Sequence, residues 1–285
     1  MTGGMDGVTV VVTGATSGMG RAMARDLVGR GADVIVVGRD ARRVRRTADE
    51  LGGHRVVGRY EADLSRHAEV RGLAVALAAD GHRVDVLVNN AGAAFDRYAL
   101  TPDGVERTHA LNLHAPVLLS HALAANGVLV PEARVITMSS FMEKQGRVAP
   151  TDPDVRGTSW AGRRWSQNRV YATSKLLALL AMNGFSRSAP GLRVYNADPG
   201  MVRTGFTGTA GGAMALVAPL TRLFARTVEE GVATPLMLAT SRPAPAAGEG
   251  YFASSRPATP SRTARDAALA ELVHRRTAEA VGITP

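Results

Sequence analysis

The run VTVVVTGATSGMG at residues 8–20 joins an apolar, β-branched segment to a glycine-rich turn and leads into a helical pattern. Glycines at positions 14, 18 and 20 let the backbone turn tightly and approach a pyrophosphate group, which binds at the N-terminus of the following helix. Their spacing is G-x3-G-x-G instead of the more common G-x-G-x-x-G. Glycines also serve ordinary tight turns, but a position between a first strand and a helix favours a dinucleotide-binding turn. The predicted cofactor-binding residues of this turn are Gly14, Thr16, Ser17, Gly18, Met19 and Gly20.

The first 200 residues alternate short apolar runs with longer amphipathic segments. Nearly continuous hydrophobicity within a run is typical of parallel strands that are buried on both faces. The alternation predicts a single-domain, doubly wound α/β fold with a mostly parallel sheet of about seven strands flanked by helices. Predicted strands lie at 8–12, 34–37, 54–60, 84–88, 134–138 and 192–196, and predicted helices at 19–30, 40–51, 65–80, 103–126, 168–189 and 263–281. Residues 241–262 are rich in Pro, Ala and Ser and predict a loop around the sequence GYF.

The composition of the 285-residue chain excludes several classes of protein. It contains no cysteine, which rules out disulfides, thiolate nucleophiles and cysteine-ligated metal sites. No apolar run is long enough to span a bilayer, and no basic residue precedes Arg21, as it would in a secretory signal. The sequence also contains no HExxH zinc motif and no G-x-S-x-G hydrolase elbow. We therefore expect a soluble, cytoplasmic protein with no metal site and no membrane contact.

The positive net charge raises the question of a nucleic-acid partner. The chain has 34 Lys and Arg against 25 Asp and Glu, a formal net charge of +9. The arginines are scattered, however, and the densest cluster, RDARRVRR at 39–46, contains no aromatic residue. Aromatic residues make up only 5% of the chain, which is little material for base stacking. We expect no nucleic-acid partner and assign the arginine cluster to a small phosphate-bearing ligand.

The end of the second predicted strand indicates which dinucleotide binds. An acidic side chain there would hydrogen-bond the adenosine ribose hydroxyls and repel a 2′-phosphate. Here the strand VIVV ends in Gly38 and is followed by Arg39, whose guanidinium can bind a phosphate with two hydrogen bonds. Arg43, one helical turn later, could assist. Asp40 could instead bind a ribose hydroxyl, but it fits better as the N-cap of the next helix. The sequence predicts NADP(H) in preference to NAD(H).

A tyrosine and a lysine stand four residues apart in NRVYATSKLLALL at residues 168–180. On a helix, Tyr171 and Lys175 would lie on one face and could act together. Alternatively they form the polar edge of a buried helix, since a YxxxK pattern often arises by chance. The only lysines of the chain are Lys144 and Lys175, while arginine supplies the other positive charges. A lysine kept at this position favours a specific chemical role for it.

Several spaced motifs follow one another in order along the chain. They are TGATSGMG at 13–20, ADL at 62–64, NNAG at 89–92, Asn112, SS at 139–140, YATSK at 171–175 and DPGMVRT at 198–204. With these motifs the sequence resembles the short-chain dehydrogenase/reductase family over nearly its whole length. The later EEGVATPLMLATS at 229–241 and GYF at 250–252 are similar to the retinol-dehydrogenase-like branch. The resemblance implies one Rossmann-fold domain over residues 1–285.

The resemblance also implies roles for particular positions. Four residues match the catalytic tetrad of the family: Asn112, Ser140, Tyr171 and Lys175. Asp63 and Leu64 would bracket the adenine, although Asp63 could simply cap the helix that begins near Ser65. The other residues implied to hold or support the cofactor are Asn89, Asn90, Ala91 and Gly92 beside the fourth strand, and Pro199, Gly200, Val202 and Thr204 at the nicotinamide carboxamide. NNAG could also be only a turn, and Asn112 only a satisfied polar group in its helix.

Tyr171 would be the general acid and base of the implied reaction. A carbonyl that accepts hydride becomes an alkoxide and needs a proton, but the ordinary tyrosine pKa of about 10 is too high for ready exchange at neutral pH. The Lys175 ammonium and the positive nicotinamide ring would lower that pKa by roughly 2–3 units, which corresponds to about 3–4 kcal/mol. Lys175 would also bind the nicotinamide ribose, and Ser140 would donate to the substrate oxygen. Asn112 would hold a water that links Lys175 to solvent.

Two features depart from the family pattern. Ser17 stands where NADP-preferring relatives often carry a second basic residue. The segment 141–170 is longer than in most members and contains Trp160 and Trp165. We interpret it as an insertion over the substrate cleft, the alternative being a surface loop unrelated to substrate.

The substrate pocket is expected to form from residues 93–98, the insertion at 141–170 and the segment after Thr204, in which 205–225 could be a lid. We expect a small-molecule carbonyl or alcohol substrate that is apolar or polycyclic. Two alternatives remain open, namely reduction of a conjugated C=C bond with the same tyrosine and lysine, and an NADP(H)-binding sensor without turnover. The predicted helices 103–126 and 168–189 could form the interface of a homodimer or homotetramer.

Overall fold

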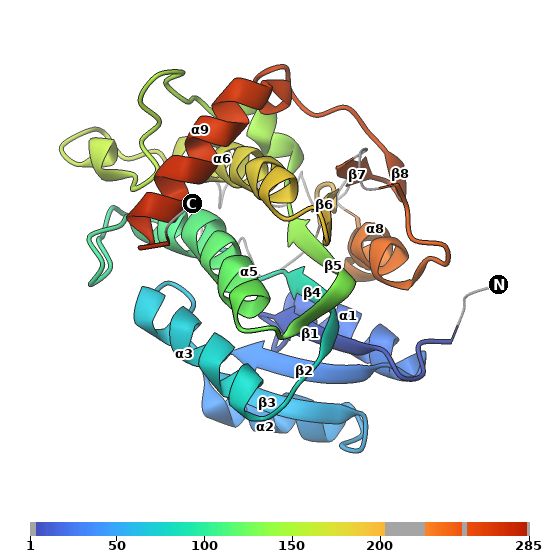
Figure 1. Ribbon diagram of the computed structural model, residues 1–285. Helices are drawn as coiled ribbons and strands as arrows, with labels where there is room; N and C mark the ends of the chain where they lie inside the picture. Colours follow the sequence, from blue (N-terminus) through green and yellow to red (C-terminus); the bar gives the residue numbers. More distant parts are fainter. Residues whose placement is uncertain (1–3, 203–225, 247–249, 284–285) are drawn as a thin grey trace.

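An eight-stranded sheet forms the centre of the protein, with the strand order β3-β2-β1-β4-β5-β6-β7-β8 (Figure 1). The computed structural model describes residues 4–202, 226–246 and 250–283. Strands β1 to β7 pair in parallel, and β8 pairs antiparallel with β7. The strands are β1 Thr9–Thr13, β2 Asp33–Gly38, β3 Val56–Glu61, β4 Val84–Asn89, β5 Leu129–Met138, β6 Arg193–Asp198, β7 Tyr251–Ala253 and β8 Arg256–Pro257. The predicted doubly wound, mostly parallel Rossmann-type sheet is confirmed.

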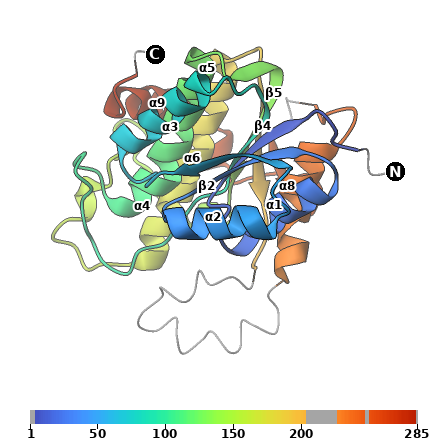
Figure 2. The same cartoon turned by 90° about the horizontal axis from the view of Figure 1, so that it is seen from below.

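Helices cover both faces of this sheet, as Figures 1 and 2 show from two directions. One face carries α1 Gly18–Gly29, α2 Ala41–Glu50 and α8 Val228–Thr240. The other carries α3 His67–Ala79, α5 Ala115–Ala125, α6 Gln167–Ser188 and α9 Ala267–Ala280. No helix within the described ranges has both the length and the apolar content needed to cross a membrane.

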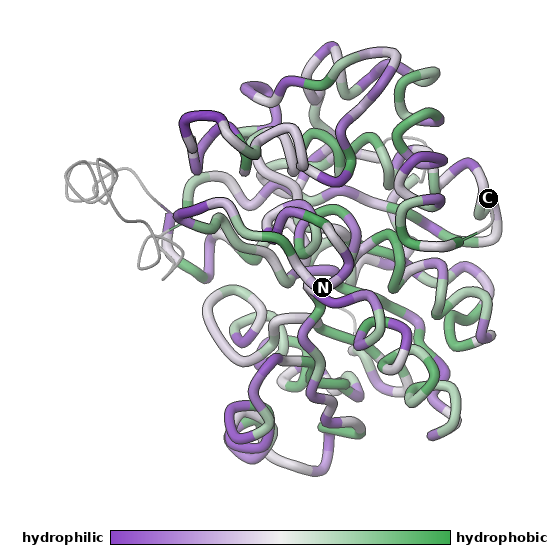
Figure 3. Tube along the Cα trace, turned by 90° about the vertical axis from the view of Figure 1, so that its left-hand side faces the viewer, coloured by the Kyte–Doolittle hydropathy of each residue, from purple (hydrophilic) through white to green (hydrophobic). Residues whose placement is uncertain are grey.

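Alternation along the buried strands separates two apolar layers. In β1, Val11 packs into the layer beneath α3, α5 and α6, whereas Val10 and Val12 pack into the layer beneath α1, α2 and α8. Successive side chains of a strand point to opposite faces, so a strand buried on both sides needs apolar residues at every position. This explains the unbroken hydrophobic runs of the sequence, and Figure 3 shows apolar segments through the middle of the fold.

The predicted helix 103–126 begins later and is not a continuous α-helix. Glu106 caps the short helix α4 Arg107–His109, which passes into a π-helical turn, η1 Ala110–His114, and then into α5. A π turn inserts one residue into the helical ladder and is often found at functional sites. This turn carries Asn112.

The second half of the chain differs from its prediction in three places. The loop prediction was wrong at GYF, since Tyr251–Ala253 forms β7 and pairs with β6. Strand β5 starts at Leu129, five residues before the predicted start at 134. The last predicted helix is divided at Asp266, which separates the 3-10 turn η6 Thr263–Arg265 from α9 and caps α9 through Leu269 N–H.

The sheet topology determines where a ligand can bind. The chain runs outward from β1 through β2 to β3 and then returns to β4 on the other side of β1. In open parallel sheets, a crevice forms at such a reversal, beyond the carboxyl ends of the strands. The glycine turn follows β1 and NNAG begins at the end of β4, so both motifs lie at this reversal.

Candidate active site

The glycine turn has the shape required for a closely approaching phosphate. Gly14 has a φ angle of +65° and Gly18 one of +48°, conformations that favour glycine. A Cβ added at Gly20 would clash with the Gly14 carbonyl and lie 2.5 Å from Asn90 Nδ2. Ser17, the N-cap of α1, makes no side-chain cap hydrogen bond, and the first turn of α1 contains no acidic residue. The positive end of this helix is therefore suited to an anionic ligand.

The end of β2 confirms one choice made from the sequence. Asp40 is the N-cap of α2, and its side chain accepts a 2.9 Å hydrogen bond from Arg43 N–H. This backbone hydrogen bond is the main cause that holds the pKa of Asp40 below its ordinary value. Arg43 Nη2 donates to the Thr16 carbonyl at 3.2 Å, which places its guanidinium beside the glycine turn, while Arg39 is exposed. The Arg43 guanidinium thus lies where a 2′-phosphate is predicted, and Arg39 directly follows β2 at the same end of the sheet.

The NNAG segment connects the glycine turn to the predicted catalytic residues. Thr13 Oγ1 accepts hydrogen bonds from the N–H groups of Asn90 and Ala91, at 2.9 and 3.0 Å, and Asn90 Nδ2 donates to Thr13 O at 2.8 Å. A Cβ added at Gly92 would lie 3.1 Å from Asn112 Oδ1 and 3.6 Å from Lys175 Nζ. The segment is thus more than a turn, because it packs between the two halves of the site. Asn89 is buried and donates to Ser120 Oγ at 3.2 Å, which supports the end of β4.

The structure shows a local role for Asp63. Its Oδ1 accepts hydrogen bonds from Ser65 N–H at 3.1 Å and from Ser65 Oγ at 2.7 Å. This is close to the alternative considered from the sequence, a carboxylate that organises the start of the next helix. Leu64 is buried in the layer beneath α3. Contact of Asp63 and Leu64 with an adenine stays a prediction.

Three hydrogen bonds, two with Ala93 and one with Ser174, hold the side chain of Asn112. Its Oδ1 accepts from Ala93 N–H at 2.9 Å, and its Nδ2 donates to Ala93 O at 2.9 Å and to Ser174 Oγ at 3.0 Å. Ser174 Oγ in turn donates to the Tyr171 carbonyl at 2.8 Å. Asn112 therefore joins the turn after NNAG to the helix that carries the tyrosine. Its side chain is a satisfied polar group, which is the alternative considered from the sequence, and its catalytic role stays a prediction.

Tyr171 and Lys175 lie on one face of α6, as predicted. Lys175 Nζ is 5.8 Å from the centroid of the Tyr171 ring and donates a 2.7 Å hydrogen bond to the Met138 carbonyl at the end of β5. Ser140 follows two residues later, caps the 3-10 turn η2 Phe141–Gln145, and hydrogen-bonds the Tyr171 side chain. The fold thus brings all four tetrad positions together at the carboxyl ends of β4 and β5.

The surroundings of Tyr171 and Lys175 shift the pKa of the tyrosine in the direction opposite to the predicted lowering. Burial raises the pKa of Tyr171 to about 12, and the negative charge of Asp198 adds to this, while the hydrogen bond with Ser140 acts in the opposite direction. Burial lowers the pKa of Lys175 to about 8, and Asp198 opposes that shift. The predicted lowering of the tyrosine pKa relied on the Lys175 ammonium together with the positive nicotinamide ring, and Lys175 is not among the groups that shift the pKa of Tyr171 here. For the groups of the protein itself, desolvation of the phenolate has the larger effect.

The segment at 198–202 lies beside the start of α8. Gly200 has a φ angle of +74°, and its N–H donates to Asp198 Oδ1 at 2.9 Å. A Cβ added at Gly231 of α8 would lie 2.5 Å from Val202 Cγ2 and 3.3 Å from Met19 Sδ, so Val202 and Met19 meet at this glycine. Pro199 precedes Gly200 at the same sheet end. The predicted site residue Thr204 and the predicted lid 205–225 lie outside the described residues.

The end of the predicted insertion lies beside another predicted pocket segment. Gln167 Nε2, one helical turn before Tyr171, donates to the Ala94 carbonyl at 2.8 Å. The Tyr98 and Trp165 rings meet edge to face, with centroids 6.2 Å apart. Residues 94–98 and 165–167 therefore form one wall beside the end of α6 that carries Tyr171.

The middle of the 141–170 segment does not lie beside Tyr171 and Lys175. Its residues line a cavity of about 890 Å³ together with Thr173 and Leu177 of α6 and with the end of α9. Thr173 and Leu177 are each two residues from Tyr171 or Lys175, so they point to the opposite side of the helix. The structure therefore divides the 141–170 segment between the two sides of α6.

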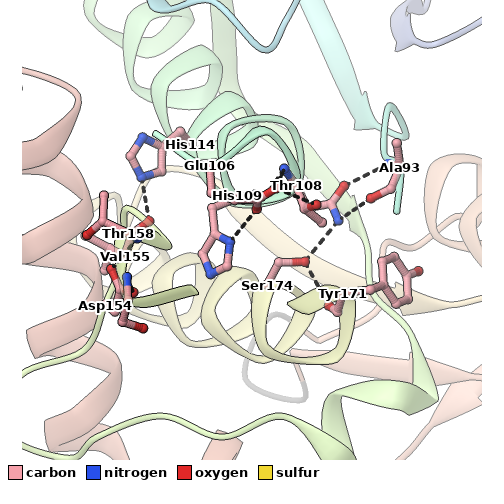
Figure 4. A network of polar contacts seen from close by, with 12 residues as sticks. Ala93, Glu106, Thr108, His109, His114, Asp154, Val155, Thr158, Tyr171 and Ser174 are labelled. Atoms are coloured by element: carbon pink, nitrogen blue, oxygen red, sulfur yellow. Dashed lines mark hydrogen bonds and ion pairs between the residues drawn. The ribbon is translucent and has the colours of Figure 1, made fainter. Parts of the chain in front are cut away.

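Several residues of the site were not singled out from the sequence. Ser174 is the serine of YATSK, so its place before Lys175 was a usable signal. Asp198 and its hydrogen-bond partner Tyr251, 2.9 Å apart, lie 53 residues apart in the chain. Glu106 is fully buried and accepts hydrogen bonds from Thr108 and His109, which anchors the start of the π turn (Figure 4). Only the folded chain shows these long-range and buried contacts.

Comparisons with known proteins identify the family of the chain. The family model for short chain dehydrogenases matches residues 8–150. The "Putative daunorubicin C-13 ketoreductase DnrU" of Streptomyces sp. (strain C5) is 33% identical over 287 residues, which cover 99% of this chain and 95% of that protein. Retinol dehydrogenase 13 of Homo sapiens is 27% identical, over 97% of this chain and 85% of its own length.

Solved structures show the same architecture. An uncharacterised protein from Mycobacterium paratuberculosis aligns with a TM-score of 0.77 and 30% identity, over 99% of this chain and 96% of that chain. A short-chain dehydrogenase from Sphingobium yanoikuyae in complex with NADPH aligns with a TM-score of 0.60 and 26% identity, over 85% of this chain and 90% of that chain.

Proposed function

Because the chain belongs to the short-chain dehydrogenase family and resembles its retinol-dehydrogenase-like branch, we propose that it is an NADP(H)-dependent oxidoreductase acting on a carbonyl or alcohol carbon. The observation that carries this proposal is the continuous path from the glycine turn to the tetrad. A Cβ at Gly14 would lie 3.1 Å from Ala91 Cα, and the next residue, Gly92, faces Lys175. A dinucleotide whose phosphates bind the glycine turn would extend along this path toward Tyr171.

The chemistry follows from the groups that meet there. When bound, the reduced nicotinamide supplies a hydride to the carbonyl carbon, and the π electrons of the C=O bond move to the oxygen. Tyr171 donates its phenolic proton to that oxygen and takes it back in the reverse reaction. Ser140 Oγ donates a hydrogen bond to the same oxygen as negative charge develops. Lys175 stabilises the tyrosinate that remains, and its fixed hydrogen bond to Met138 O keeps the ammonium beside the phenol.

The arginines at the end of β2 support the choice of NADP(H). Gly38 leaves no side chain at this position, and an added Cβ would lie 2.6 Å from Thr16 Cγ2. Asp40 is engaged as the cap of α2, so its carboxylate is directed to the Arg43 backbone. Arg39 and Arg43 can then bind a 2′-phosphate with charge-assisted hydrogen bonds. The Sphingobium yanoikuyae relative binds NADPH.

The wall formed by residues 94–98 and 165–167 supports an aromatic or polycyclic substrate. Tyr98 and Trp165 present two aromatic rings next to the end of α6, and aromatic rings favour flat apolar ligands. The Trp165 indole N–H is buried and has no acceptor within the described part of the chain, so it could donate to a polar group of the substrate. The relative DnrU is named a putative daunorubicin C-13 ketoreductase.

Substrate turnover tests the proposal. We would follow NADPH consumption, with NADH in parallel, against aromatic ketones, aldehydes, quinones and enones, and identify the products by mass spectrometry and NMR. An alcohol product supports carbonyl reduction, whereas a saturated ketone from an enone would show C=C reduction by the same residues. NADPH binding without turnover of any compound would favour a sensor over an enzyme.

A further inference from the structure

A buried carboxylate lies at the carboxyl end of β6, at the same edge of the sheet as the candidate active site. Asp198 ends strand β6 and is 5% exposed. Two residues earlier on this strand, Asn196 Nδ2 donates to Asn183 Oδ1 of α6 at 3.2 Å. Because alternate residues of a strand point to the same face, the Asp198 side chain also points to the side of the sheet that α6 covers. It lies there at the carboxyl end, where α6 carries Tyr171 and Lys175.

Two donors hold the carboxylate in place. Tyr251 of β7 donates its hydroxyl hydrogen to Asp198 Oδ2 at 2.9 Å, and Gly200 donates its N–H to Asp198 Oδ1 at 2.9 Å. Burial and the adjacent carboxylate raise the pKa of the Tyr251 phenol, so Tyr251 stays a donor. A buried carboxylate with a hydrogen bond to each oxygen is suited to carry a negative charge.

The other ionisable groups around it come from four elements. Lys175 of α6 donates to the carbonyl of Met138, which pairs in the sheet with Ala197, the residue before Asp198. The charge of Asp198 acts on Lys175 and on Tyr171, and Tyr251 of β7 donates to its carboxylate. The negative charge of Glu143 in η2 also raises the pKa of Tyr251. The Glu143 carboxylate accepts hydrogen bonds from the N–H of Ser261 at 2.8 Å and from Ser261 Oγ at 2.6 Å. Arg226, before α8, has its guanidinium 3.3 Å from where a Cβ of Gly200 would lie and donates to Ser254 Oγ at 2.9 Å. Lys175 is thus the cation that α6 brings to this carboxylate.

We propose that Asp198 is a positioning residue of the active site, whose buried negative charge keeps Lys175 an ammonium ion and sets the pH at which Tyr171 loses its proton. This inference rests on the proposed oxidoreductase function, since it gives the tyrosine and lysine their roles. Tyr251 and Gly200 hold the carboxylate in place, and the charge of Asp198 itself has the electrostatic effect.

The direction of the effect follows from charge. Asp198 raises the pKa of both Tyr171 and Lys175. Neutralising it lowers both pKa values, so the tyrosine and the ammonium each lose their proton at a lower pH. Carbonyl reduction needs the protonated tyrosine and the charged lysine. Its alkaline limb therefore moves to lower pH in Asp198→Asn, by about one pH unit for one nearby charge.

The test compares Asp198→Asn with two control variants. Asparagine keeps the size and the acceptor oxygen but removes the charge. Tyr251→Phe removes one hydrogen bond and keeps the charge, so we expect its alkaline limb to stay at the wild-type pH. Asp85→Asn removes a carboxylate that accepts from Thr9 N–H at the opposite end of the strands, and it controls for overall charge. The pH profile of kcat/KM for ketone reduction is the first measurement.

A second measurement does not depend on turnover. The tyrosinate absorbance of each protein is titrated with base, and subtraction of the titration of the same protein carrying Tyr171→Phe in addition isolates Tyr171. We expect ionisation at lower pH in Asp198→Asn than in wild type, whether or not a substrate has been found. If the wild type reduces no carbonyl, the proposed function fails while this titration still decides the role of Asp198.

Two outcomes would overturn the proposal. One is a folded Asp198→Asn protein whose alkaline limb and tyrosinate titration coincide with those of wild type. The other is an equal shift in Asp198→Asn and Tyr251→Phe, which would show that Asp198 acts only through its hydrogen bonds. Should circular dichroism show that Asp198→Asn does not fold, Asp198→Ser takes its place with the same expected direction.

Discussion

The ammonium nitrogen of Lys175 lies 5.8 Å from the centroid of the Tyr171 ring, with both residues on one face of α6. The lysine is not free to move away, because its Nζ donates to the Met138 carbonyl at the end of β5. The helix spacing and the sheet thus determine together where the positive charge stands relative to the phenol. This fixed charge is the basis of the chemistry proposed for the site.

Replacement of Arg39 by alanine is expected to weaken NADPH binding more than NADH binding. A charge-assisted hydrogen bond contributes about 1.5–3 kcal/mol, so KM for NADPH should rise by about 10- to 100-fold. Arg43→Ala should act in the same direction. Arg45→Ala is the matched control, since Arg45 is exposed on the same helix. Steady-state kinetics with both cofactors checks this, and an unchanged NADPH preference in Arg39→Ala would refute the phosphate assignment.

Replacement of Gly20 by alanine is expected to impair dinucleotide binding. The added methyl would clash with Gly14 O and lie 2.5 Å from Asn90 Nδ2, so the glycine turn must shift. Such overpacking costs about 1–3 kcal/mol, and we expect weaker NADPH binding by fluorescence titration. Gly29→Ala is the control on the same helix, because no atom lies within 4 Å of its added Cβ. Equal affinities of the two variants would contradict the proposed role of the turn.

Replacement of Trp165 by alanine is expected to affect large aromatic substrates selectively. An aromatic contact contributes about 0.5–1.5 kcal/mol beyond buried area, so kcat/KM for polycyclic ketones should fall by about 3- to 10-fold. Small aliphatic ketones should be affected less. Trp160→Ala is the matched control, since Trp160 lines the cavity on the other side of α6. A uniform loss for all substrates, or an equal loss in both variants, would show that Trp165 does not contact the substrate.

The features predicted well from the sequence have local causes. Short segments with a clear period or spacing predict the glycine turn, the buried strands and the pair of Tyr171 and Lys175. Asp40 was recognisable as a cap because N-cap residues have a strong local preference. These short segments also gave the order of strands and helices in the first 200 residues.

The features that were missed depend on distant partners. The π turn at Ala110–His114 has no separate sequence pattern, and Asn112 gains its contacts from Ala93 and Ser174. Tyr251–Ala253, which overlaps GYF, forms a strand because it pairs with β6. The middle of the 141–170 segment lies on the side of α6 that carries Thr173 and Leu177, where it lines a cavity together with the end of α9. The π turn, strand β7 and the course of the insertion depend on packing between segments that are distant in the chain, and the periodicity of a short segment does not reveal such packing.

The central claim is that Tyr171 transfers the proton during NADPH-dependent carbonyl reduction, and the Tyr171→Phe variant tests it most directly. NADPH oxidation and NADPH binding are measured in parallel for wild type and variant with a ketone that the wild type reduces. General acid catalysis contributes about 10²–10⁴-fold to a rate. We therefore expect turnover to fall by at least about 100-fold, with NADPH affinity within a factor of about 3, a difference below 1 kcal/mol. Wild-type turnover in Tyr171→Phe would contradict the account.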